Sequence, residues 1–328
     1  MEPLFSPTST SSVGQDSRLD SYQTMQSILD TASTSSKQAH DEHLWFEDGS
    51  VVLESGGIFF KVYSGILARS SPVFKDMFSF PQPEAGDPSA EIVQDIAVKD
   101  AAMVVGLLRL STKYEVPHLR HRAIQILREW YPAELATFMA LPRAFLPPDE
   151  YPRHALVANA ARETDVPILL PAALLLCCAT ASVNTLWDGL DVPTEAGTVA
   201  RCDLSQMNKR ALFLGRPLLA HHARTRVQSF FFYPHTDEPR DKTLRCQAPE
   251  RCGSFCRIYA SVYDDKEDPW MNPFYKLNWK SIRSTCCNVC AARWEKHHDE
   301  ATRELWEELP KLFNLPSWDV LKEQVKNV

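Results

Sequence analysis

Residues 59–78 constrain the fold of this 328-residue chain more than any other segment, because a strand there runs directly into two helices. Residues 51–54 and 58–63 are both rich in β-branched and aromatic side chains. Gly56 and Gly57 stand between these two runs, which is typical of a tight turn. We therefore predict a β-hairpin over residues 51–63.

Two helices are predicted to follow the hairpin. Ser64 is a residue type that caps helix starts, and Ile66 and Leu67 lie on one face of the first helix. Ser71-Pro72 starts the second helix, since proline suits a first helical turn. Residues 91–96 favour a third strand, and residues 104–127 predict a helix pair around a turn at residues 113–118.

These segments resemble the BTB/POZ domain. Its opening reads F-x-V-H, then L-A-x-x-S, then P-V-F-x-x-M-F, as residues 59–78 nearly do. Its late helices read A-L-L-x-L-x-x-K-Y-x-V-x-x-L-R, which residues 107–120 resemble. The opening W-F-x-D-G at residues 45–49 is similar to the large BTB family of mushroom-type fungi. The resemblance implies an α+β interaction domain over residues 41–130.

Two features depart from the family pattern. Tyr63 stands where the family has histidine, and we expect its ring to pack in that place. The core helix that follows the third strand in the family is missing near residues 97–103. Because the loss of a core helix exposes its apolar partners, we interpret the chain as a splice variant or a gene model lacking an exon. A naturally divergent small domain is the alternative.

The resemblance implies protein–protein interaction without enzymatic chemistry. The expected partner is a second copy of the chain or another BTB protein. Expected core or interface residues are Trp45, Phe46, Val51, Ile66 and Leu67.

Three narrower functions stay open. One is an adaptor for a cullin-type ubiquitin ligase, although residues 80–84 lack the apolar-x-Glu motif in register. Another is a transcriptional or chromatin regulator with a zinc-bound C-terminal module. The third is a truncated product with impaired function.

The regions on either side of this domain differ in composition. Residues 1–40 are rich in Ser, Thr, Gln and Asp, which predicts a disordered tail because little apolar surface can be buried. Residues 131–328 are expected to be mainly helical. Predicted helices cover residues 132–141, 155–163, 171–181, 205–214, 218–232, 257–263 and 291–312, and residues 187–201 are expected to form a loop.

Cysteines cluster between residues 246 and 290. The spacing Cys287-x-x-Cys290 lets two thiolates face one ion, and Cys246 and Cys252 would complete a tetrahedral zinc site. The alternative is that these cysteines are free thiols in a helical core. Cys177-Cys178 is expected to be core, and His297-His298 is expected to lie on a solvated helix face.

Composition excludes several classes of function. A net charge of −7 disfavours direct binding to nucleic acid or to anionic membranes. The apolar run at residues 166–181 is too short to span a bilayer comfortably. No secretory signal is recognised, so reduced cysteines in the cytoplasm or nucleus are expected. Motifs for metalloprotease, phosphate-loop and serine-hydrolase chemistry are missing from the sequence, and we expect no enzyme.

Overall fold

The computed structural model of the chain describes residues 40–55, 58–79, 101–141, 150–193, 199–232, 245–264, 272–274 and 277–326. It divides into two compact units, residues 1–67 with 78–92, and residues 68–77 with 93–328. The predicted tail up to residue 39, the third strand at residues 91–96 and the shortened connection at residues 97–100 lie outside the described residues.

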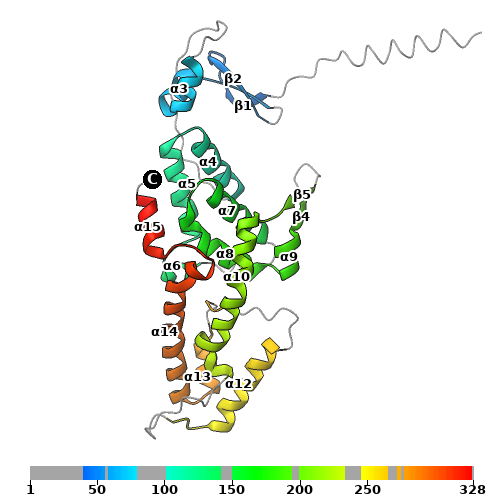
Figure 1. Cartoon of the computed structure of the whole chain (residues 1–328), viewed down its shortest axis with the longest axis vertical. Helices are drawn as coiled ribbons and strands as arrows, with labels where there is room; N and C mark the ends of the chain where they lie inside the picture. The colour runs from blue at the N-terminus through cyan, green and yellow to red at the C-terminus, as the bar shows by residue number, and fades with distance from the viewer. Residues whose placement is uncertain are drawn as a thin grey trace, which may run out of the picture. The chain divides into compact units, whose positions relative to one another are not determined.

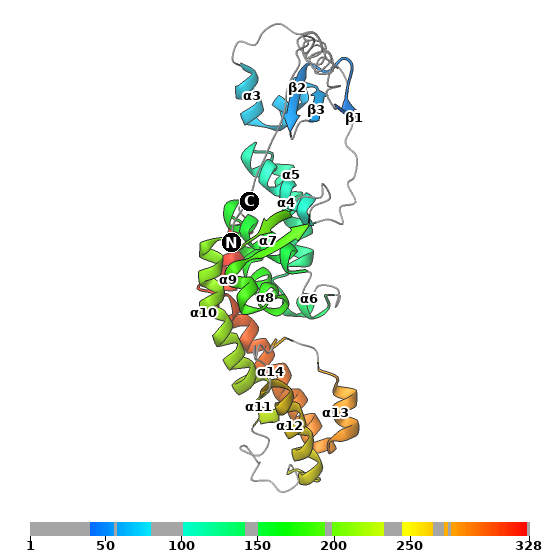
Figure 2. The same ribbon diagram turned by 90° about the vertical axis from the view of Figure 1, so that its right-hand side faces the viewer.

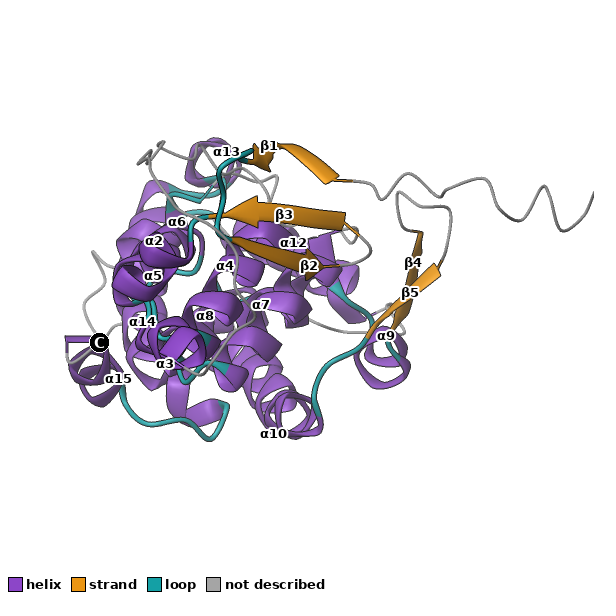
Figure 3. Ribbon diagram, turned by 90° about the horizontal axis from the view of Figure 1, so that it is seen from above, coloured by secondary structure: helices purple, strands orange, loops and turns teal. Residues whose placement is uncertain are grey.

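The first unit contains a small three-stranded sheet of β1 (His40–Trp45), β2 (Val51–Ser55) and β3 (Ile58–Val62). The strand order is β1-β3-β2, so β3 lies in the middle (Figure 3). β3 runs antiparallel to β2 and parallel to β1. The predicted hairpin is confirmed, because Ser55 pairs with Ile58 across the turn.

Tyr63 is the anchor of this unit. It is buried, its hydroxyl donates to Asp48 Oδ1 at 2.7 Å, and its ring centroid lies 5.1 Å from that of Phe46. α2 (Ser64–Ser70) begins at the next residue. The backbone N–H of Ser64 donates to Ser50 Oγ at 2.8 Å, so the first turn of α2 is tied to the start of β2.

The second unit is helical, with one additional β-hairpin (Figure 1). Its helices are α3 (Pro72–Ser79, up to Met77 in this unit), α4 (Ala101–Lys113), α5 (Pro117–Trp130), α6 (Leu135–Met139), α7 (Tyr151–Glu163), α8 (Leu170–Thr180), α9 (Val183–Asp188), α10 (Gln206–His222), α11 (Ser229–Phe232), α12 (Pro249–Asp264), α13 (Trp279–Thr285), α14 (Asn288–Leu312) and α15 (Trp318–Lys326).

α3 is fixed at its start by Ser71. The N–H of Phe74 donates to Ser71 Oγ at 3.1 Å, which is the helix cap that the Ser-Pro step predicts. The same hydroxyl donates to the backbone oxygen of Tyr114, and the Phe74 ring stacks on Tyr114 at 4.6 Å. The start of α3 therefore attaches to the turn that joins α4 and α5.

α8 forms the centre of a large core. Ten of its eleven residues are buried, so this helix is apolar on every side, including Cys177 and Cys178 as expected. α7, α10 and α14 pack around it. No helix among the described residues has the length and apolar character needed to cross a bilayer.

Two predictions for the middle of the chain are wrong. Residues 187–201 are not a single loop, because they include the end of α9 and a hairpin of β4 (Leu190–Pro193) and β5 (Val199–Cys202). Gly189, with φ of 78°, makes the sharp turn from α9 into β4. The two helices predicted over residues 205–232 are joined, since α10 continues through Pro217 to a π-helical turn, Ala223–Val227.

α14 connects two cores. Near its C-terminus Leu305, Trp306 and Leu309 belong to the large core, where the Trp306 ring stacks on Trp318 at 5.5 Å. Near its N-terminus Cys290 and Trp294 belong to a second, smaller core. Figures 1 and 2 show α12 and α13 beside this N-terminal half of α14.

Candidate metal centre

Three segments of the smaller core bring four cysteines together. Cys246 lies just before α12, and Cys252 lies in the first turns of α12. Cys287 is the N-cap residue of α14, and Cys290 is in its first turn. The start predicted for the helix at residues 257–263 is wrong, because α12 already begins at Pro249, so that Cys252 and Cys256 lie inside the helix.

The four sulfurs lie close enough to share one ion. All Sγ atoms of Cys246, Cys252, Cys287 and Cys290 lie within 4.8 Å of one another, and the Cys246–Cys287 pair is 3.9 Å apart. A tetrahedral ion with Zn–S bonds of about 2.3 Å places its sulfurs about 3.8 Å apart. The donor set and the spacing therefore fit a zinc ion after small movements. All four cysteines are free of disulfides.

Backbone N–H groups point at these sulfurs. The N–H of Cys287 donates to Cys252 Sγ at 3.3 Å, and the N–H of Cys290 donates to Cys287 Sγ at 3.4 Å. Burial raises the pKa of Cys287, but hydrogen bonds from the backbone N–H groups of Cys290 and Gln247 outweigh it, and the pKa falls to about 6. The start of α14 therefore stabilises the thiolate form of Cys287.

The other buried thiols resist ionisation without a cation. Burial, together with neighbouring sulfurs, raises the pKa of Cys252 and of Cys290. A divalent cation would supply the positive charge that such thiolates need. Burial also raises the pKa of Cys256 and of Cys286 to about 12. The Cys256 thiol donates to the backbone oxygen of Phe230 at 3.5 Å, so its proton already has a structural role.

The two histidines of α14 stand apart from the four cysteines. His297 is exposed as predicted, and its Nε2 lies 2.7 Å from the backbone oxygen of Arg226. The solvated position predicted for His298 is wrong, since only 3% of it is exposed. It lies two turns after Cys290 on the buried face, with its ring 5.5 Å from that of Trp279. Burial lowers the pKa of His298, because the charged imidazolium loses its hydration there.

The interaction residues predicted in the first unit remain accessible. Trp45, Phe46, Val51 and Leu67 are partly exposed, and Ile66 is 45% exposed. Among the residues described between 40 and 67 whose side chains are placed, only Gly49 and Tyr63 are buried. Val52, which the sequence did not single out, is 51% exposed, because the alternation of Val51 and Val52 gives no sign of which face of the strand is covered.

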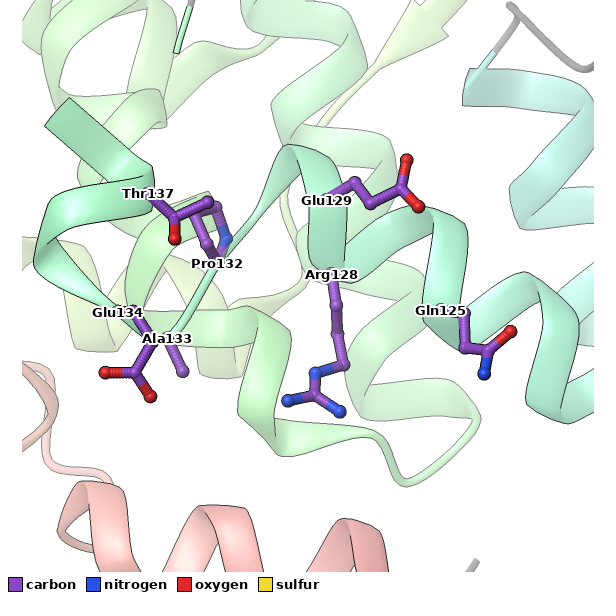
Figure 4. Close-up of a pocket in the computed structure, with 7 residues that line it drawn as sticks. All are labelled: Gln125, Arg128, Glu129, Pro132, Ala133, Glu134 and Thr137. Atoms are coloured by element: carbon purple, nitrogen blue, oxygen red, sulfur yellow. The ribbon is translucent and has the colours of Figure 1, made fainter. Parts of the chain in front are cut away.

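A cavity of about 530 Å³ lies between α5 and α6 (Figure 4). Glu134 at its rim is paired with Lys322 at 2.7 Å, and Arg128 extends between Gln125 and Glu134. The lining residues are Gln125, Arg128, Glu129, Pro132, Ala133, Glu134 and Thr137. This set contains neither a cysteine nor a histidine, and it lies apart from the four-cysteine cluster.

Comparisons with models of protein families, with curated proteins and with solved structures give no match to this chain.

Proposed function

We propose that this chain is a non-enzymatic protein–protein interaction protein in which residues 41–130 form a BTB/POZ-like dimerisation module. One observation carries the proposal beyond the sequence resemblance. The apolar side chains of the three-stranded sheet and of the start of α2 remain at least partly accessible, apart from Tyr63.

A sheet of this size needs a covering layer. Two- and three-stranded sheets become stable when one face packs on another layer of structure. β1 and β2 are both edge strands, and Val52 of β2 and Ile66 of α2 are about half exposed. A second copy of the chain would supply both the apolar cover and a pairing partner for an edge.

Light scattering after size exclusion of the full chain tests this proposal. We expect twice the chain mass at micromolar concentration, and the monomer mass for the double variant Val52→Asp, Ile66→Asp. The control Ile258→Asp changes a residue of α12 that is 68% exposed, and it should remain dimeric. A monomeric wild type, or a double variant that still dimerises, would overturn the proposal.

We propose in addition that Cys246, Cys252, Cys287 and Cys290 hold a structural zinc ion. The supporting observation is the mutual approach of four sulfurs within 4.8 Å. Catalytic zinc sites keep a position open for water, whereas sites with four protein ligands are closed. Four cysteine ligands in a largely buried core therefore favour a structural role over catalysis.

Metal analysis of the purified chain tests the second proposal. We expect one zinc per chain, and less than about a tenth of that for Cys290→Ser. Cys202→Ser is the matched control, because Cys202 is a partly buried cysteine outside the cluster. Iron in place of zinc would give visible absorption. Zinc missing from the wild type after expression in zinc-supplemented medium would overturn the zinc proposal and leave the dimerisation proposal untouched.

A further inference from the structure

The outer face of α10 carries a row of exposed apolar residues, in addition to the buried apolar residues of its inner face. Its inner residues, such as Leu212 and Leu219, are buried in the large core. On the outer face Met207, Leu214 and Leu218 are 65%, 50% and 46% exposed. Contiguous exposed apolar residues on a protein surface mark a site of interaction with a partner. Figure 2 shows α10 at the edge of the helical unit, and the exposed fractions of these three side chains show that its outer face is open.

Trp187 of α9 extends this apolar surface. Its side chain is 60% exposed, and its ring packs against Phe213 with centroids 5.0 Å apart and planes at 80°. Lys209 Nζ donates to the backbone oxygen of Trp187 at 2.7 Å and pairs with Asp203 at 2.7 Å. The tryptophan is therefore held in place before any partner arrives, which lowers the entropic cost of binding.

The charged residues of α10 itself are all basic. Residues 204–232 contain no aspartate or glutamate. Arg210, His221 and Arg224 are exposed along α10 and the turn that follows it. On the side of Trp187, Asp191 is paired with Arg201, and Asp188 is an exposed acidic residue at the margin of the apolar surface. A second copy bound through the same face would place arginine near arginine, so charge favours a different, acidic partner.

We propose that this α9–α10 surface, formed by Trp187, Met207, Phe213, Leu214 and Leu218, binds an acidic amphipathic helix of another protein. Met207 to Leu218 spans about 16 Å along α10, or three turns. A partner helix laid along this row would cover it with apolar residues at positions i, i+4, i+7 and i+11. Acidic residues beside that apolar face would meet the basic side chains of α10, and Trp187 would contact the partner at one side of the row.

Fluorescence anisotropy with two labelled peptides tests the proposal on the full chain. The first peptide is a helix of about 18 residues with leucine at i, i+4, i+7 and i+11 and with glutamate at the flanking positions. The second has lysine in place of every glutamate. We expect the acidic peptide to bind at least about tenfold more tightly, with a preference that weakens between about 50 and 300 mM salt.

Substitutions locate the binding surface. Leu214→Glu should weaken the acidic peptide at least about tenfold, and Arg210→Glu should weaken it severalfold. Ile258→Glu introduces the same charge at an exposed apolar residue of α12 and should change binding less than about twofold. Unfolding curves of each variant verify that all of them are folded.

Three outcomes would overturn the proposal. The first is that the wild type binds neither peptide or binds both equally. The second is that Leu214→Glu leaves the affinity for the acidic peptide unchanged. The third is that Leu214→Glu abolishes self-association in light scattering, which would assign this surface to a second copy of the chain.

Discussion

The helical unit contains two cores that differ in their residue composition. In the large core around α8, apolar residues such as Leu174, Leu175 and Trp306 are almost fully buried. In the small core around Trp294, five of the eleven buried members among the described residues are cysteines. The large core is stabilised by apolar burial, whereas the small one combines apolar side chains such as Phe230 and Trp294 with a cluster of thiols. A bound metal would add its binding free energy to the stability of the small core.

The largest expected effect separates the two cores by their need for metal. Cys287→Ser removes a proposed zinc ligand but keeps the cap of α14, because a serine hydroxyl also accepts at an N-cap. It should lower the melting temperature by about 10 °C, since each kcal/mol is worth about 2–4 °C in a domain of this size. Differential scanning calorimetry with and without a chelator measures the change. Cys202→Ser should show the wild-type response to the chelator. If the chelator does not change the melting temperature of the wild type, the small core does not depend on a metal and the two cores do not differ in this respect.

A cavity in the large core should cost nearly as much without any effect on metal. Leu175 is fully buried in α8, so Leu175→Ala should lower the free energy of unfolding by about 2–5 kcal/mol. Urea denaturation measures the loss, and metal analysis should still find one zinc per chain. Loss of zinc in this variant would mean that the two cores do not behave independently.

Two glycines of the helical unit differ in the space around them. A Cβ at Gly215 of α10 would collide with the Phe313 ring and lie 2.9 Å from the backbone oxygen of Leu312, so Gly215→Ala should destabilise by about 1–3 kcal/mol. A Cβ added at Gly106 of α4 would meet open space. Gly106→Ala should therefore raise the free energy of unfolding by about 0.5–1 kcal/mol. Equal effects in thermal unfolding would contradict the close approach of α10 to Phe313.

The smallest expected effect concerns the ion pair between the π-helical turn and α14. Arg226 lies 2.8 Å from Glu308, and its hydrogen bond lowers the pKa of that carboxyl. A carboxyl group whose pKa is lowered by folding stabilises the folded state at every pH above its ordinary, unfolded-state pKa. This stabilisation is lost as the pH falls through the lowered pKa. Glu308→Gln should therefore cost up to about 1 kcal/mol at pH 7.

Acid should remove this cost. Below about pH 3 the wild type and Glu308→Gln should unfold at nearly the same urea concentration, because the carboxyl is protonated in both the folded and the unfolded wild-type chain. A difference that persists at low pH would assign the effect to packing rather than to charge.

Local sequence signals predicted much of the secondary structure. Gly56-Gly57 indicated the hairpin, and Ser71-Pro72 indicated the start of α3, because turn and cap chemistry acts over a few residues. The hairpin of β4 and β5 was missed, since its strands have only four residues each and lie within a segment that shows little periodicity. The sequence predicted two helices on either side of Pro217, although α10 continues through this proline.

The sequence by itself determined the kinds of chemistry available in this chain. The Cys287-x-x-Cys290 spacing identified one half of a thiolate site, and the apolar composition of α8 indicated a buried helix. Only the tertiary structure decided that Cys246 and Cys252 approach that half-site, that His298 is buried and that the outer face of α10 is open. The physical reason is distance along the chain. Caps and turns depend on neighbouring residues, whereas ligand sets and exposed surfaces depend on which remote segments pack together.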